Sequence, residues 1–339
     1  MVSGKTASEP PFLEHYKSIF KASSEINQLR EKQQHQVVEE CELPLIDLRG
    51  LRSGNKAERT TCIATIAKAS SEWGFFQVLN HGVSLELLAE MRKEQKKLFE
   101  VPFEQKVSSK LLNDSYRWGT PSATSLDQFS WSEAFHVPLA MISKVDSCNR
   151  EFEHLREVME LIADAMSELA HTLAGVLAEN LGYPGHCFAK SCNKSTCFLR
   201  LNRYPPCSFS PETFGLQPHT DSDFLTILCQ DQVGGLQLMK DSQWVAVKPN
   251  PNALIVNIGD LFQAWSNDIY KSVEHKVMPN AKLERYSMAY FLCPSYDSTI
   301  GNCTEVSLYK IFTFGEFRKQ VQEDVKQTGK KVGLPRFLR

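Results

Sequence analysis

Five side chains in the second half of the chain have the types and spacing that could hold a metal ion and a small acid. The sequence reads His219-x-Asp221, with His275 much later and Arg285-x-Ser287 soon after it. Alternate residues of a strand share a face, so His219 and Asp221 can bind one ion that His275 reaches from a neighbouring strand. Two imidazoles and one carboxylate on one side of an ion leave its other side open. This arrangement is typical of non-haem Fe(II) oxygenases.

The Arg285-x-Ser287 pair could bind a carboxylate beside that metal. Both side chains share a strand face by the same alternation. A guanidinium group binds a carboxylate through two parallel hydrogen bonds, and a hydroxyl can add a third. Taken singly these signals are weak, because a lone His-x-Asp is often a turn and a lone arginine is most often a surface ion-pair residue. Their order and spacing together favour a functional site.

Composition argues against several classes of protein. The chain has 339 residues, of which 42% are apolar and 10% aromatic, and this is enough for a packed core. A formal net charge of −2 without a basic block argues against nucleic acid as a partner. We expect no signal peptide and no membrane partner, because no apolar run of suitable length stands out. A small molecule is the expected partner, and the oligomeric state is left open.

The cysteines indicate a reducing compartment. All ten are scattered along the chain without a C-x-x-C pair or a common zinc-binding spacing. Free thiols are the better interpretation of such a pattern, because disulfides persist mainly in oxidising compartments. We therefore expect a cytoplasmic protein, with the nucleus as an alternative location.

The elements that must position these residues fall into three regions, which we expect to form one compact unit. Residues 1–195 are predicted to be helix-rich, with early strands at 43–47 and 75–80. Residues 196–300 carry short strands, and 301–339 a final helix and tail. The predicted fold class is therefore α+β, with a double-sheet roll wrapped by helices that come mostly from the N-terminal half. A roll of this kind offers a cavity between its sheets.

Periodicity predicts where the longer elements lie. Apolar residues recur at steps of three and four from 152 to 176, which indicates a long amphipathic helix ending near Gly182. Residues 113–140 are rich in Ser, Thr, Gly and Pro and are expected to be a loop. Later in the chain, short runs separated by turn residues predict strands at 197–204, 224–229, 236–239, 244–247, 254–258 and 286–292.

The metal motif and two further stretches resemble the plant soluble Fe(II)- and 2-oxoglutarate-dependent dioxygenases. Asn202-Arg-Tyr-Pro-Pro206 resembles that family's Asn-x-Tyr-Pro-Pro strand, and Trp73–Gly82 resembles its N-terminal signature, here interpreted as core and turn. The resemblance covers essentially the whole chain. It implies a double-stranded β-helix, or jelly roll, that uses Fe(II), 2-oxoglutarate and O2, with ascorbate as a candidate reductant. It also implies that Tyr204 helps to hold 2-oxoglutarate, with Asn202 nearby on the same face.

Three more stretches resemble the gibberellin 2-oxidases, and specifically the class that acts on C20 precursors. They are 115–124, 130–138 and 257–275, of which the first is the most distinctive. The resemblance implies 2β-hydroxylation, which inactivates the hormone pathway. A gibberellin is a rigid apolar acid, and it needs apolar walls and a cation in its pocket. The loop residues expected to contact it are Tyr116, Arg117 and Trp118.

Three other hypotheses remain compatible with these residues. The same chemistry could act on another plant acid or a flavonoid-type substrate. Two histidines and a carboxylate could also serve a zinc hydrolase, although Arg285, Ser287 and the lack of an H-E-x-x-H motif argue against it. A non-catalytic hormone-binding protein could keep the fold, and the intact set of metal ligands argues against that.

Overall fold

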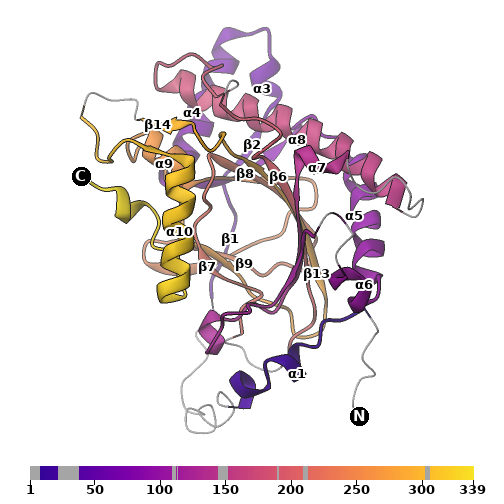
Figure 1. Cartoon of the computed structure of the whole chain (residues 1–339). Coiled ribbons are helices and arrows are strands. Elements are labelled where there is room, and N and C mark those ends of the chain that lie inside the picture. The colour runs from indigo at the N-terminus through magenta and orange to yellow at the C-terminus, as the bar shows by residue number, and fades with distance from the viewer. Residues whose placement is uncertain are drawn as a thin grey trace.

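This computed structural model describes residues 8–21, 38–108, 112, 114–143, 152–188, 191–208, 213–301 and 306–339. Two β-sheets face each other and form a roll, with helices around it (Figure 1). The smaller sheet has five strands, in the spatial order β1 (Glu40–Cys41), β10 (Gln243–Val247), β9 (Leu236–Lys240), β12 (His275–Val277) and β7 (Leu216–His219).

The larger sheet has eight strands and also takes in the early part of the chain. Its spatial order is β2 (Leu45–Asp47), β3 (Phe75–Leu79), β11 (Leu254–Ile258), β8 (Leu225–Gln230), β13 (Arg285–Leu292), β6 (Phe198–Tyr204), β5 (Glu133–Pro138) and β4 (Tyr116–Trp118). A small hairpin joins β14 (Thr299–Ile300) to β15 (Phe312–Thr313). The predicted jelly roll in an α+β fold is confirmed.

Helices cover the outside of the larger sheet. The described helices are α1 (Phe12–His15), α3 (Arg49–Arg52), α4 (Lys56–Glu72), α5 (Leu85–Glu100), α6 (Phe103–Val107), α7 (Leu139–Ile142), α8 (Glu153–Asn180), α9 (Asp260–Trp265) and α10 (Phe314–Thr328), with short 3-10 turns at Leu126–Gln128 and Leu334–Phe337. The long helix α8 packs on β13 and β8 and against α4 and α5. On the other side of the roll, α10 stands beside the opening (Figure 1).

The sequence pattern explains the longest helix, α8. The apolar stripe of α8 is buried in the main core, and the chain turns away at Gly182, whose φ is 83°. By length and composition α8 could cross a membrane, which corrects the expectation that no such run exists in the chain. However, 61% of its most apolar window is buried, as in the core helix of a globular fold. The expectation of no membrane partner stays a prediction.

Helix α10 has defined ends, which matters because it borders the cavity. Thr313 and Glu316 form a reciprocal capping box at its start, and Gly329 adopts a left-handed conformation with φ 75° at its end. These signals hold the helix in register, so that one of its faces stays turned toward the opening of the roll.

Two buried cores support the roll. The larger lies between the eight-stranded sheet and the helices, with α8 at its centre. The smaller lies between the two sheets and includes Phe75, Leu238, Ile255 and Val277. The loop expected at 113–140 contains the strands β4 and β5, and β5 is paired along its whole length with β6. The eight cysteines within the described residues are free thiols, and the reducing compartment stays a prediction.

Candidate metal centre and active-site cavity

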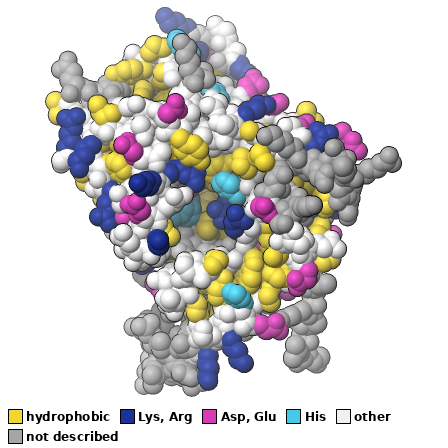
Figure 2. All heavy atoms as spheres, in the orientation of Figure 1, with side chains coloured by type: hydrophobic (Ala, Val, Ile, Leu, Met, Phe, Trp, Pro, Cys, Tyr) yellow, Lys and Arg dark blue, Asp and Glu magenta, His cyan; other side chains and the backbone are white. Residues whose placement is uncertain are grey.

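A cavity of about 280 Å³ opens between the two sheets, close to the size of a small-molecule site. Its walls come from both sheets and from α10. Seven of the residues expected to hold metal or cosubstrate line it: His219, Asp221, His275, Arg285, Ser287, Tyr204 and Asn202. Figure 2 shows basic side chains gathered around a hollow on this face of the molecule.

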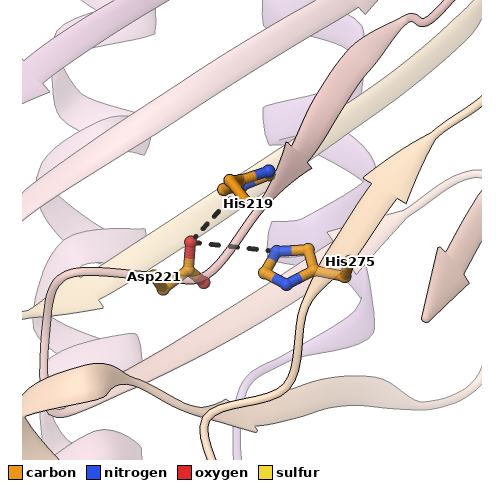
Figure 3. A group of neighbouring side chains, drawn as sticks. All are labelled: His219, Asp221 and His275. Carbon is orange, nitrogen blue, oxygen red and sulfur yellow. Dashed lines mark ion pairs between the residues drawn. The ribbon is translucent and has the colours of Figure 1, made fainter. Parts of the chain in front are cut away.

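The three candidate metal ligands converge at one end of the cavity (Figure 3). His275 stands directly opposite His219 in the β12–β7 ladder, which puts their ring centroids 4.3 Å apart. Asp221 Oδ1 lies 3.6 Å from His219 Nε2 and 3.8 Å from His275 Nε2. One ligand atom from each residue lies within 4.8 Å of the others, so one ion could touch all three.

Asp221 reaches this point differently from the sequence-based expectation. Strand β7 ends at His219, and Asp221 lies in the turn that follows. Strand alternation therefore does not place this carboxylate. Tertiary contacts hold the turn instead: the backbone amide of Asp260 donates to the Asp221 carbonyl at 2.9 Å.

The atoms facing the metal position have the donor pattern that a metal requires. His219 Nδ1 lies 2.7 Å from the Gln217 carbonyl and His275 Nδ1 lies 3.1 Å from the Val273 carbonyl. These carbonyls accept hydrogen bonds from Nδ1, which leaves Nε2 of each ring as the nitrogen that can bind a metal. Burial, followed by the proximity of His275, lowers the pKa of His219 to about 3, so this imidazole is neutral.

Two residues that the sequence did not single out orient the carboxylate. Thr226 Oγ1 and Asn257 Nδ2 donate to Asp221 Oδ2 at 2.7 and 2.8 Å. Oδ1, the oxygen closest to both histidines, is left for a metal. The set of two imidazoles and one anchored carboxylate fits Fe(II). Both supporting residues come from neighbouring central strands, β8 and β11, and only the sheet pairing brings them here.

The backbone around Asp223 is packed too closely for any side chain at position 259. A Cβ on Gly259 would lie 2.1 Å from Asp223 Oδ1 and 2.2 Å from its carbonyl oxygen. Burial, reinforced by the charge of Asp221, raises the pKa of Asp223 well above its usual range. The direction of this shift favours the uncharged form of Asp223 beside the metal ligand.

At the other end of the cavity, the guanidinium group of Arg285 is poised for an anion. Its Nη2 donates to Gln230 Oε1 at 2.8 Å, whereas Nε and Nη1 are buried without a hydrogen-bond partner in the described part of the chain. Burying an unpaired charge is costly, and an incoming carboxylate would remove that cost. Tyr204 stands directly opposite Arg285 in the β13–β6 ladder, with its ring 4.9 Å from Arg285 Cζ.

Ser287 and Asn202 form the next rung of that ladder. They are directly opposite each other, and Asn202 Nδ2 donates to Ser287 Oγ at 3.4 Å. Gln95 of α5 donates to both of their backbone carbonyls, at 3.0 and 2.9 Å. The buried amide of Gln95 therefore ties the two strands together behind the site. Together with the two free Arg285 N–H groups, these contacts fit the distal carboxylate of 2-oxoglutarate.

The structure does not bring Tyr116 and Trp118 to this cavity, which corrects the expectation for these two residues. In β4 they pair with Phe135 and Glu133, on the sheet face turned away from the cavity. The Tyr116 hydroxyl donates to the buried Glu133 carboxylate, and Trp118 packs edge-on against aromatic residues outside the roll. The sequence analysis expected a loop here, and the alternation of faces along β4 appears only in the structure.

Arg117 occupies the opposite face, but it does not line the cavity either. It pairs with Ala134 of β5, on the same face as the cavity-lining His136. Its side chain is exposed, and Nη1 donates to the carbonyls of Asp114 and Tyr116 at 2.7 and 2.6 Å. A contact between Arg117 and substrate stays a prediction.

Comparisons with known families agree with this architecture. Residues 195–294 match the 2OG-Fe(II) oxygenase superfamily, and residues 43–155 match the N-terminal region described as non-haem dioxygenase in morphine synthesis. Among solved structures, the rice dioxygenase for auxin oxidation is 31% identical, with a TM-score of 0.72 over 88% of this chain and 100% of that chain. JOX2, crystallised with 2OG, Fe and JA, is 34% identical, with a TM-score of 0.71 over 85% of this chain and 87% of its own.

Curated relatives are more similar still. Gibberellin 2-beta-dioxygenase 6 of Oryza sativa subsp. japonica is 61% identical, over 88% of this chain and 86% of the rice protein. Gibberellin 2-beta-dioxygenase 8 of Arabidopsis thaliana is 55% identical, over 97% of this chain and 98% of its own. With a superfamily match over residues 195–294, which hold the metal and carboxylate residues, Fe(II) and 2-oxoglutarate are the cofactors. The chain therefore belongs to the 2OG-Fe(II) oxygenase superfamily and, within it, to the family of gibberellin 2-beta-dioxygenases.

Proposed function

We propose that this protein hydroxylates gibberellins at C2β, with C20 precursors as its preferred substrates. The observation that carries the proposal is the near full-length similarity to proteins named gibberellin 2-beta-dioxygenase, in a chain whose five metal and carboxylate residues converge on one cavity. The preference for C20 precursors rests on the resemblance of residues 115–124 to the C20-acting class. Such a reaction removes active hormone or its precursors.

Each part of the cavity has a task in this reaction. His219, Asp221 and His275 would hold Fe(II), and Arg285 with Ser287 would hold the distal carboxylate of 2-oxoglutarate. When bound, the metal and cosubstrate supply the oxidising power to hydroxylate a C–H bond, as O2 is consumed and 2-oxoglutarate becomes succinate and CO2. The protein orients one C–H bond toward the metal and keeps bulk water away from the reacting atoms.

The wall chemistry supports an apolar substrate that carries acid groups. Near the metal the cavity is lined by aromatic and aliphatic side chains, among them Phe75, Leu228 and Val277. Basic residues also line it, so a rigid hydrocarbon skeleton with carboxylates would meet both kinds of surface. A flavonoid-type substrate would use the apolar walls but would leave the basic groups without a partner.

The test is to identify products by mass after incubating purified protein with Fe(II), ascorbate, 2-oxoglutarate and a panel of C20 gibberellins, C19 gibberellins and flavonoids. We expect a mass gain of one oxygen on C20 gibberellins, and fragmentation that places the hydroxyl at C2. Equal rates on C19 gibberellins would refute the C20 preference. Turnover of flavonoids alone would refute the hormone substrate.

Two further outcomes address the alternatives. Gibberellin binding without any succinate formation would indicate a hormone-binding protein. Zinc retained after anaerobic purification, with hydrolysis in place of hydroxylation, would indicate a hydrolase. The superfamily match and the unpartnered N–H groups of Arg285 argue against both the hormone-binding protein and the hydrolase.

A further inference from the structure

The cavity also carries two arginines that are not among the residues assigned to the metal or to 2-oxoglutarate. Arg200 projects from β6 and Arg318 from α10, and both line the cavity. His136 of β5, directly opposite Arg200 in the ladder, lines it too. Burial, followed by the charges of Arg200, Arg318 and Arg117, lowers the pKa of His136 to about 4. The imidazole is therefore neutral, and the positive charge of this region belongs to the guanidinium groups.

No carboxylate neutralises Arg200 or Arg318 among the residues that the structure describes. Arg200 Nε donates to Asn202 Oδ1 at 2.9 Å, which leaves its two terminal amino groups for another acceptor. Arg318 Cζ lies over the rings of Tyr296 and Phe314, 5.8 and 5.9 Å from their centroids. Both side chains are only partly exposed. Two half-buried cations without anions attract a carboxylate more strongly than cations fully surrounded by water.

A second arginine of β6, three residues further on, provides a contrast. Arg203 lies in the same strand but is paired with Glu133 at 2.7 Å and with Glu284 at 2.8 Å. Arg203 therefore acts in an internal ion-pair network. Arg200, which alternates to the cavity face, has no such partner, and its charge is available to a ligand.

An aromatic wall adjoins the two arginines. The ring of Phe198 stacks on His136 with centroids 3.9 Å apart, and on Phe291 with centroids 4.3 Å apart and an interplanar angle of 11°. All three line the cavity. A neutral imidazole and two phenyl rings offer a flat apolar surface for a rigid hydrocarbon skeleton.

We propose that Arg200 and Arg318 form a subsite that binds a carboxylate of the gibberellin, while His136, Phe198 and Phe291 pack against its ring system. The inference rests on the proposed function and assigns specificity-determining residues to it. A substrate without the acid group would leave both guanidinium groups desolvated and unpaired, and this penalty discriminates against neutral analogues.

This subsite is separate from the one that holds 2-oxoglutarate. Tyr204 stands opposite Arg285, whereas Arg200 stands opposite Ala289 further along the same ladder. Four residues of extended strand span roughly 13 Å, so the backbones of Arg285 and Arg200 lie well apart along the ladder. One small dicarboxylate and one larger acid can therefore be bound at the same time.

The test combines charge-neutral variants with charge-neutral substrates. Arg200→Gln and Arg318→Gln would be assayed on a C20 gibberellin dicarboxylic acid and on its monomethyl and dimethyl esters. Lys319→Gln is the matched control, because Lys319 is the exposed neighbour of Arg318 in α10. We expect each arginine variant to raise KM for the free acid at least about tenfold, the size of a lost charged hydrogen bond. KM for 2-oxoglutarate should stay unchanged in both arginine variants. Lys319→Gln should have the same KM values as the parent protein.

The esters make the assignment specific. In the parent protein, the ester that masks the recognised carboxylate should raise KM by a similar factor. In the arginine variants the same ester should add little, because the interaction has already been removed. Arg318→Lys, which keeps the charge, should recover part of the loss. Melting temperatures of all variants would identify any folding defect.

The outcomes separate this inference from the function on which it rests. A parent protein that hydroxylates gibberellins, with KM values that neither the arginine variants nor the esters change, overturns the subsite and leaves the function standing. A parent protein that hydroxylates no gibberellin overturns the proposed function, and the subsite for that acid with it.

Discussion

The ammonium group of Lys331 lies 2.6 Å from Asp260 Oδ2, beside the turn that carries the metal ligand Asp221. The same ammonium group donates to the Thr220 carbonyl at 2.8 Å and to the Ser222 hydroxyl at 2.7 Å, so it contacts both chain neighbours of Asp221. Its side chain is 11% exposed. The segment after α10 is thereby fastened to the metal-binding turn.

Removing this contact should loosen the metal site. We predict that Lys331→Met weakens Mn(II) or Fe(II) binding about 10- to 100-fold, as is usual when a group that orients a metal ligand is lost. Lys330→Met is the matched control, since Lys330 is exposed and lies 3.9 Å from Asp127. Anaerobic calorimetric titration measures both affinities. Equal affinities in the two variants would mean that Lys331 supports only the tail.

The metal ligands themselves should be indispensable. We predict that His219→Ala, Asp221→Ala or His275→Ala each abolishes hydroxylation and metal binding, because each removes one of three protein ligands. The fold should survive, since the strands frame the cavity without the ion. His186→Ala serves as the control, because His186 is exposed and is not among the residues that line the cavity. Substantial hydroxylation by metal-loaded Asp221→Ala would refute the assignment of that ligand.

Arg285→Lys should selectively affect the cosubstrate. The variant keeps the charge but loses the two free N–H groups of the planar fork, so a bidentate contact becomes a point contact. A loss of about 1.5–3 kcal/mol corresponds to a roughly 10- to 150-fold higher KM for 2-oxoglutarate. The iron requirement should stay the same. Overlapping 2-oxoglutarate titrations of the variant and the parent would make Arg285 a structural residue.

A second set of charges contributes to stability on the outer face of the large sheet. Glu133 is fully buried and binds Lys106 at 2.6 Å, Arg203 at 2.7 Å and the hydroxyl of Tyr116. Glu133→Ala would leave Lys106 buried without its anion and would remove one carboxylate partner of Arg203. We predict a loss of about 3–5 kcal/mol in the free energy of unfolding.

Urea denaturation followed by circular dichroism measures that loss. Glu284→Ala is the control: it also pairs with Arg203, but its side chain is 45% exposed, and we expect at most about 1 kcal/mol. A Glu133 variant as stable as the Glu284 variant would show that the buried network contributes no net stability.

Strand pairing explains why some of the predicted site residues line the cavity and others do not. Arg285 and Ser287 are two positions apart in a strand, and alternation puts both on one face, whereas Tyr204 and Asn202 were implied by the family resemblance. Alternation alone does not say which face will meet the cavity. The sequence could not show that Tyr116 and Trp118 face outward, because that depends on how β4 and β5 pair with β6.

The amino-acid sequence by itself determined the chemistry of this protein: two imidazoles, a carboxylate, a guanidinium group and a hydroxyl in an order that strands can bring together, within an α+β roll. Only the tertiary structure decided how they are supported and what else joins them. Asp221 is positioned by a turn held by Asp260, and Arg318 enters from a helix far along the chain. Such contacts depend on the packing of distant segments, which no local pattern records.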